Sequence, residues 1–293
     1  MNKNIQQICQ KINSADILNK KFYPVWFFTN EKIGCFLPKI KEIKGIKKVF
    51  SIGGGGDFAF SLLSVSNFDQ IDEINVCDIR QMASLTIDFK LAFLKNLEYE
   101  VLLDLFLGKR FFDKNNIYDR VVNNMSPIGK EAFCDIMKGY RETHFLKYLK
   151  KTGFWYNDSF WQIKHRERYL PYLISKQNYQ LLQKNVDKIT IYCGDFNKNI
   201  GLFKDSYYDL VYISNILDSK KYCRDHDLYL KTVKSKLNNK GLLITLTQDS
   251  PQKIIKLLEN NGFLLYDTKE NRFNIISACF GYYSYSFLLF QNL

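Results

Sequence analysis

Short apolar runs alternate with longer helical patterns along most of this chain. The runs are rich in β-branched and aromatic residues and are bounded by turn residues, which predicts strands. These runs lie at 48–52, 74–78, 188–193, 208–217, 242–247, 262–266 and 283–290. The segments between them carry amphipathic helical patterns, such as the face formed by Leu85, Phe89, Ala92, Phe93 and Leu97. This alternation predicts an α/β fold with a doubly wound sheet, and the last two runs predict an antiparallel hairpin at its edge.

Two stretches do not follow the alternation. Residues 1–47 read as helices broken by an aromatic segment at 22–28, which either covers a pocket or packs this segment onto the domain. Residues 98–185 stay helical in character, although a single crossover helix needs far fewer residues. We therefore predict an N-terminal helical and aromatic segment over 1–47, followed by a sheet domain over 48–293 with a helical insertion at about 98–185.

The first junction between a strand and a helix carries the clearest chemical signal. The strand enters Gly53, Gly54, Gly55 and Gly56, and Asp57 follows. Glycines allow a sharp turn and a close approach of the backbone to a ligand. The turn does not resemble a phosphate-binding loop, because no Gly-Lys-Ser/Thr follows and Asp57 would repel a phosphate. An uncharged or cationic nucleoside fits better, and S-adenosylmethionine, a sulfonium that carries an adenosine and an amino acid, has that description.

Polar residues stand at the ends of the other predicted parallel strands. In an open α/β sheet, ligands bind at the carboxyl ends of the strands, near the point where strand order reverses. There Asp78 would hold the ribose hydroxyls, and Asp195 would accept a hydrogen bond from the adenine amino group. Each acid also has an ordinary explanation, because Asp after a strand is a common helix N-cap or turn former. The predicted cofactor-binding set further includes Asp57 or its neighbouring backbone near the cationic amino-acid end, Ile79, Phe196 against the base, Ser214 and Asn215.

Taken together and in this order, these features resemble the pattern of the class I S-adenosylmethionine-dependent transferases, which implies a Rossmann-like sheet. A closer resemblance lies in 78–100, DIRQMASLTIDFKLAFLKNLEYE. Its Asp, its Lys-Leu-Ala helix and its Leu-x-Tyr-Glu continuation are similar, in register, to the BtaA-like family of S-adenosylmethionine:diacylglycerol 3-amino-3-carboxypropyl transferases. Further similarity lies at 105–108, 118–120, 126–127, 138–139 and 212–218. The glycine turn and Arg80-Gln81 depart from the family pattern, which leaves the acceptor open.

The resemblance implies a 3-amino-3-carboxypropyl transferase that releases methylthioadenosine. Its acceptor would be a small molecule, a lipid headgroup or a nucleotide-containing compound. The candidate catalytic residues are Asp218, Tyr212 and Tyr282. The candidates for holding a carboxylate or phosphate of donor or acceptor are Arg141, Arg166 and Arg168, unless they belong to a solvated basic helix face. The alternatives are a methyltransferase on the same fold and a basic nucleic-acid-binding protein with a vestigial cofactor pocket.

Composition restricts the partners. The net charge of +12 favours polyanions such as nucleic acid, an anionic membrane surface or a phosphorylated substrate, although AT-rich coding sequence produces the same bias. Seven cysteines without C-x-x-C and three histidines without H-x-x-x-H predict reduced thiols and no metal. No window approaches eighteen apolar residues and the N-terminus has no apolar signal region, so we expect a cytoplasmic protein without a transmembrane segment. Peripheral contact with a membrane is left open.

Overall fold

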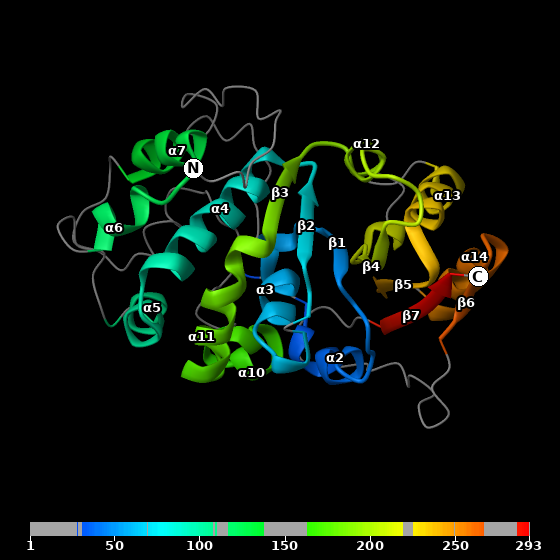
Figure 1. The fold of residues 1–293 in the computed structure, drawn as a ribbon, viewed down its shortest axis with the longest axis horizontal. Coiled ribbons are helices and arrows are strands. Elements are labelled where there is room, and N and C mark those ends of the chain that lie inside the picture. The colour runs from blue at the N-terminus through cyan, green and yellow to red at the C-terminus, as the bar shows by residue number, and fades with distance from the viewer. Residues whose placement is uncertain are drawn as a thin grey trace.

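A computed structural model describes residues 28, 31–68, 70–107, 109, 117–137, 163–218, 225–248, 250–266 and 286–292. Within these residues seven strands form one sheet (Figure 1). They are β1 (Lys48–Ile52), β2 (Glu73–Asp78), β3 (Ile189–Cys193), β4 (Tyr208–Tyr212), β5 (Leu237–Thr247), β6 (Phe263–Leu265) and β7 (Ser286–Asn292). Their order in the sheet is β3-β2-β1-β4-β5-β7-β6.

This strand order confirms the predicted doubly wound α/β sheet. Neighbouring strands are parallel from β3 to β5, and the chain moves outward from β1 in one direction and from β4 in the other. The C-terminal pair is antiparallel, as predicted, but β7 lies between β5 and β6, so that β6 forms the edge. The side chains from Phe287 to Phe290 are buried on both faces of β7, as in an interior strand, whereas Leu264 and Leu265 of β6 are exposed.

Helices cover both faces of the sheet. On one face lie α2 (Ile33–Ile40), α3 (Asp57–Leu63), α4 (Gln81–Asn96), α5 (Tyr99–Phe106) and α11 (Lys176–Asn185). The other face carries α12 (Phe196–Ile200), α13 (His226–Lys236) and α14 (Pro251–Asn260). Successive residues of a strand pack alternately into the two layers, because side chains alternate across a strand. In β1, for example, Val49 packs into the first layer and Phe50 into the second.

The region predicted as a helical insertion contains several short helices. Besides α5 and α11, its described residues form α6 (Asp119–Val122), α7 (Pro127–Met137), α10 (Arg166–Tyr169) and the 3-10 turn η4 (Pro171–Leu173). Their apolar side chains join the core on the α3 and α4 face. In the N-terminal segment, Phe28 is fully buried against Phe106, with ring centroids 5.1 Å apart, so this aromatic residue packs onto the domain.

A buried carboxylate fixes the start of α7 against α4. Asp88 Oδ2 accepts hydrogen bonds from the Ser126 hydroxyl at 2.7 Å and from the Ser126 N–H at 3.2 Å. A Cβ added to Gly129 would lie 2.0 Å from the same oxygen, so α7 approaches this closely only because Gly129 has no side chain. Burial raises the pKa of Asp88 to about 6, against the opposing effect of the Ser126 bonds.

The raised pKa of Asp88 predicts that the folded chain loses stability as pH rises. Asp88 binds a proton more readily in the folded chain than in the unfolded chain. Its favourable contribution to the free energy of unfolding is therefore complete below about pH 4 and disappears as pH rises through 6. The rise in pKa from 3.8 to about 6 corresponds to about 3 kcal/mol in the free energy of unfolding. We therefore expect Asp88→Asn to be up to that much more stable than wild type at pH 7.5, with a flatter profile in urea unfolding between pH 4 and 7.5. Identical profiles would contradict this prediction.

Candidate functional site at the carboxyl ends of the strands

The turn after β1 requires glycine at three successive positions. The φ angles of Gly54, Gly55 and Gly56 are +44°, +77° and +81°, in the region that side chains disfavour. A Cβ at Gly56 would lie 2.8 Å from the Phe60 ring and 3.2 Å from Ile87. In contrast, nothing lies within 4 Å of a Cβ built at Gly54, which is exposed. The backbone at Gly54 is therefore open to close approach by a ligand.

Asp78 ends β2 directly beside this turn. A Cβ added to Gly53 would lie 2.6 Å from Asp78 Oδ2, so the carboxylate can sit here only against a glycine. Oδ2 accepts from the Gly54 N–H at 3.3 Å, and Oδ1 accepts from the Arg80 N–H at 2.9 Å. Removal from water raises the pKa of Asp78, while these N–H groups and the Arg80 charge oppose the rise. Each carboxylate oxygen has a second lone-pair site, which suits the paired hydroxyls of a ribose.

The end of β3 lies next to Asp78. The Gly194 N–H donates to the Asp78 carbonyl at 2.9 Å. Asp195 is exposed, and its Oδ1 accepts from the Lys198 N–H at 3.0 Å, so it caps α12. Ile79, which follows Asp78, is 64% exposed and offers an apolar surface at the same edge. The structure thus brings the predicted residues Asp78, Ile79 and Asp195 together.

Phe196 occupies a different environment. Its ring is only 7% exposed and packs edge-on against Phe50, with centroids 5.1 Å apart, and against Tyr229 at 4.8 Å. These contacts belong to the apolar layer between the sheet and α13. Phe196 is therefore a core residue, and packing against a nucleobase would require its ring to leave that layer.

The residues at the end of β4 contact Glu31, an acid from the N-terminal segment that the sequence analysis missed. The hydroxyls of Tyr212 and Ser214 both donate to the Glu31 carboxylate, one to each oxygen. Glu31 is 7% exposed, and the Tyr212 ring is stacked on Phe58 with centroids 4.0 Å apart. Ser214 adopts a φ of +51°, and half-buried Asn215 follows it at the same edge. Tyr212, predicted as catalytic, is therefore a buried residue whose hydroxyl donates to Glu31.

Asp218 ties two elements of this edge together. It ends the 3-10 turn η6 (Ile216–Asp218). Its Oδ1 accepts from the Thr247 hydroxyl at 2.6 Å, and its Oδ2 accepts from the Gln248 N–H at 2.7 Å. One carboxylate oxygen therefore holds the last residue of β5 and the other holds the residue after it, which is a sufficient structural reason for an acid at this position.

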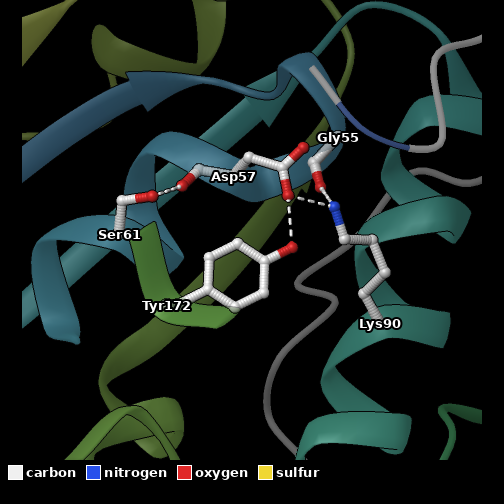
Figure 2. Close-up of polar contacts among 5 residues, drawn as sticks. All are labelled: Gly55, Asp57, Ser61, Lys90 and Tyr172. Atoms are coloured by element: carbon white, nitrogen blue, oxygen red, sulfur yellow. Dashed lines mark hydrogen bonds and ion pairs between the residues drawn. The ribbon is translucent and has the colours of Figure 1, made fainter. Parts of the chain in front are cut away.

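Asp57 points into the protein beneath the glycine turn (Figure 2). Its carboxylate forms an ion pair with Lys90, and its Oδ1 also accepts from the Tyr172 hydroxyl at 2.7 Å. The Lys90 ammonium donates in addition to the Gly55 carbonyl at 2.7 Å, and the Ser61 hydroxyl donates to the Asp57 carbonyl at 2.6 Å. Asp57 is fully buried and Lys90 is 2% exposed. Between the two predicted alternatives, the neighbouring backbone is therefore better placed for a ligand than the Asp57 side chain.

Burial dominates the electrostatics of this cluster. It lowers the pKa of Lys90, an effect that the Asp57 charge opposes, and it raises the pKa of Tyr172, an effect that Asp57 reinforces. Lys90 stands within the apolar run Phe89 to Leu94 of α4, where a charged residue needs a buried partner. The sequence analysis missed Lys90, although a lysine within an apolar helical run indicates a buried ion pair.

Two of the three predicted arginines lie in the described part of the chain, and both are on α10. Arg166 and Arg168 belong to α10, which packs against α2; a Cβ at Gly34 would lie 3.0 Å from the Arg168 carbonyl. Arg166 donates to the Ile163 carbonyl at 3.4 Å, and Arg168 is exposed. Figure 1 draws α10 beside α2 and away from α12. Arg141 and Tyr282 lie outside the described residues.

The described parts of the chain lack two kinds of feature. Among those residues, no group of His, Cys, Asp and Glu side chains is arranged to bind a metal ion. No helix in the same parts combines the length and apolar character needed to cross a membrane.

Similarity to known proteins is found among solved structures. No protein-family model matches this sequence, and no curated protein sequence does. A S-adenosylmethionine-dependent methyltransferase from Aquifex aeolicus is 10% identical, with 97% of this chain and 100% of that chain covered and a TM-score of 0.41. The cyclase SpnF is 9% identical, with coverages of 94% and 90% and a TM-score of 0.42. The spermidine synthase from Thermotoga maritima is 11% identical, with coverages of 85% and 53% and a TM-score of 0.35. Because these identities and TM-scores are low, the similarities do not assign a function to this chain.

Proposed function

We propose that this protein is a S-adenosylmethionine-dependent transferase. The observation that carries the proposal is the Asp78 carboxylate, which Gly53 accommodates and Gly54 binds at the carboxyl edge of the sheet. An acid at the end of the second strand, beside a glycine turn after the first, suits the ribose of a nucleoside cofactor. The exposed side chain of Ile79 supplies an apolar surface for the attached base.

The residues present fit this cofactor. Asp78 would accept hydrogen bonds from the two ribose hydroxyls, while the open backbone at Gly54 admits the ligand. Asp195 is exposed, and the oxygen that does not cap α12 can accept from the adenine amino group. When bound, S-adenosylmethionine supplies a sulfonium that activates three carbons. The chain contributes by positioning the cofactor and acceptor and by excluding water.

We further propose 3-amino-3-carboxypropyl transfer as the reaction. Support comes from the resemblance of 78–100 to the BtaA-like transferases. Methyl transfer on the same site is the alternative, and the nucleoside product distinguishes them: the first reaction leaves methylthioadenosine and the second leaves S-adenosylhomocysteine. The net charge of +12 supports an acceptor with an anionic group, either a small molecule, a lipid headgroup or a nucleotide-containing compound.

The test is mass spectrometry of the nucleoside formed from S-adenosylmethionine, with a cell extract as the source of acceptor. We expect methylthioadenosine that depends on wild-type protein and is absent with Asp78→Ala. S-adenosylhomocysteine instead would establish a methyltransferase. Neither product, together with a steeply salt-dependent affinity for RNA or DNA, would support the nucleic-acid-binding alternative and reject a transferase.

A further inference from the structure

The helical insertion reaches the buried cluster beneath the glycine turn through Tyr172 (Figure 2). Tyr172 lies in η4, and its ring packs edge-on against Phe60 of α3, with centroids 5.6 Å apart. Its hydroxyl donates to Asp57 Oδ1 at 2.7 Å, the oxygen that also pairs with Lys90. Burial and the Asp57 charge raise the pKa of Tyr172, so the hydroxyl stays protonated and remains a hydrogen-bond donor. The insertion therefore supplies one of the groups that hold the Asp57 carboxylate.

Neighbouring parts of the insertion hold η4 on both sides of Tyr172. The Asn178 side-chain amide, from α11, donates to the Pro171 carbonyl at 3.0 Å. The Tyr99 hydroxyl, from α5, donates to the Leu173 carbonyl at 3.1 Å. Because the residues before and after it are bonded in this way, the position of the Tyr172 hydroxyl follows the position of the insertion.

Lys90 extends this contact to the backbone of the turn. Its ammonium donates to the Gly55 carbonyl at 2.7 Å. A peptide group is planar, so the orientation of this carbonyl also sets the Gly56 N–H on the opposite side of the same peptide. That N–H donates to the Gly53 carbonyl, which closes the turn. The ammonium therefore orients the peptide that closes the turn.

The first two residues of the closed turn contact the end of β2. The Gly53 N–H donates to the Cys77 carbonyl at 2.7 Å, and the Gly54 N–H donates to Asp78 Oδ2 at 3.3 Å. A continuous series of hydrogen bonds and backbone groups thus connects Tyr172 with the carboxylate that would hold the ribose.

We propose that Tyr172 is a positioning residue of the cofactor site. Through Asp57 and Lys90 it sets the backbone of the glycine turn against which Asp78 is held, so that affinity for S-adenosylmethionine depends on the position of the insertion. The identity of the ligand rests on the proposed function, whereas the effect of Tyr172 on the turn can be measured without any ligand.

Tyr179 provides a matched control on the same insertion. It is fully buried in α11, and its hydroxyl donates to the Leu97 carbonyl, at the C-cap of α4, at 2.7 Å. At the rise of an α-helix, Leu97 lies about 10 Å along α4 from Lys90. Tyr179→Phe therefore removes a buried tyrosine hydrogen bond of the insertion at a distance from the glycine turn.

The first measurement is hydrogen–deuterium exchange of the ligand-free protein, observed at the Gly56 amide by NMR. Tyr172→Phe keeps the ring and removes the donor, so we expect the Gly56 amide to exchange about tenfold faster than in wild type. With Tyr179→Phe the rate should stay within about twofold of wild type. An unchanged rate in Tyr172→Phe, or equal increases in the two variants, would overturn the inference.

The second measurement is calorimetric titration with S-adenosylmethionine, at a temperature at which thermal unfolding shows every variant to be folded. We expect Tyr172→Phe to bind about five- to tenfold more weakly than wild type, and Tyr179→Phe to bind within about twofold. Added to Asp78→Ala, Tyr172→Phe should cost less than about twofold, because the carboxylate through which it acts is gone.

The other outcomes separate the inference from the proposed function. An equal loss from Tyr172→Phe with and without Asp78 would show that Tyr172 does not act through that carboxylate, which overturns the inference alone. Wild-type protein that does not bind S-adenosylmethionine would overturn the proposed function, and the exchange rates would still decide whether Tyr172 sets the turn.

Discussion

The Lys90→Met variant should unfold with a free energy about 3–5 kcal/mol below that of wild type. Methionine fills the space of the lysine stem but leaves the Asp57 carboxylate buried without its cation. Removing one partner of a buried ion pair costs this much because an uncompensated charge stays in a medium that solvates it poorly. The variant also removes the hydrogen bond from Lys90 to the Gly55 carbonyl, which supports the glycine turn.

Urea unfolding at pH 7.5 would measure the effect, with a control on the same helix. Lys95 pairs with Asp187, whose side chain is 82% exposed, so Lys95→Met should cost less than about 1 kcal/mol. In the double variant Lys90→Met/Asp57→Asn the buried charge is gone while an oxygen for Tyr172 remains, and we expect at least half of the lost stability to return. Equal losses for Lys90→Met and Lys95→Met would show that the buried pair contributes nothing beyond a surface pair.

The Asp78→Ala variant should lose at least about 100-fold in affinity for S-adenosylmethionine. Two hydrogen bonds from ribose hydroxyls to a charged acceptor are removed, each worth about 1.5–3 kcal/mol. The fold should persist, because the carboxylate is partly exposed and the Gly54 and Arg80 N–H groups that it accepts from lie at the same edge. Calorimetric titration measures the affinity, and wild-type binding by this variant would show that the donor site is assigned wrongly.

Gly53→Ala provides a graded version of the same experiment. The φ of Gly53 is −56°, which alanine adopts without strain, so the backbone tolerates the change. The new Cβ would lie 2.6 Å from Asp78 Oδ2, and the carboxylate must move to admit it. We expect an affinity about tenfold below wild type, between those of wild type and Asp78→Ala, because a displaced carboxylate meets the ribose hydroxyls less well.

The sheet and the position of Asp78 were predictable because both depend on local patterns. Strands buried on two faces require continuous apolar runs, and the run at 208–217 contains β4 for that reason. A turn from a strand into a helix with three positive φ angles requires glycine, so the glycines at Gly54 to Gly56 marked this turn in the sequence. The acid after the next strand could then be placed by topology alone. The position of β7 inside the sheet depended on long-range pairing that no local pattern specifies.

The contacts of Glu31 and Phe196 could not be predicted from the sequence. Glu31 meets Ser214, which is 183 residues away, and the segment around it has no periodicity from which that contact could be inferred. Phe196 follows a strand-end acid, which is the position of a ring that packs on a nucleobase. Its ring instead packs on Phe50 and Tyr229, which are distant in sequence as well. Asp195 was assigned two roles, and the cap of α12 is one of them.

The interior position of β7 has a consequence for synthesis on the ribosome. Translation delivers β6 before β7, yet β6 pairs in this sheet with β7, and β7 bridges it to β5. A nascent chain that ends before Ser286 therefore exposes one edge of β5, whose residues Leu242 to Thr247 are apolar or β-branched. This edge is covered only after Ser286–Asn292 has emerged, so the β5 side of the sheet is completed late and its apolar edge is open to strand pairing with other chains until then.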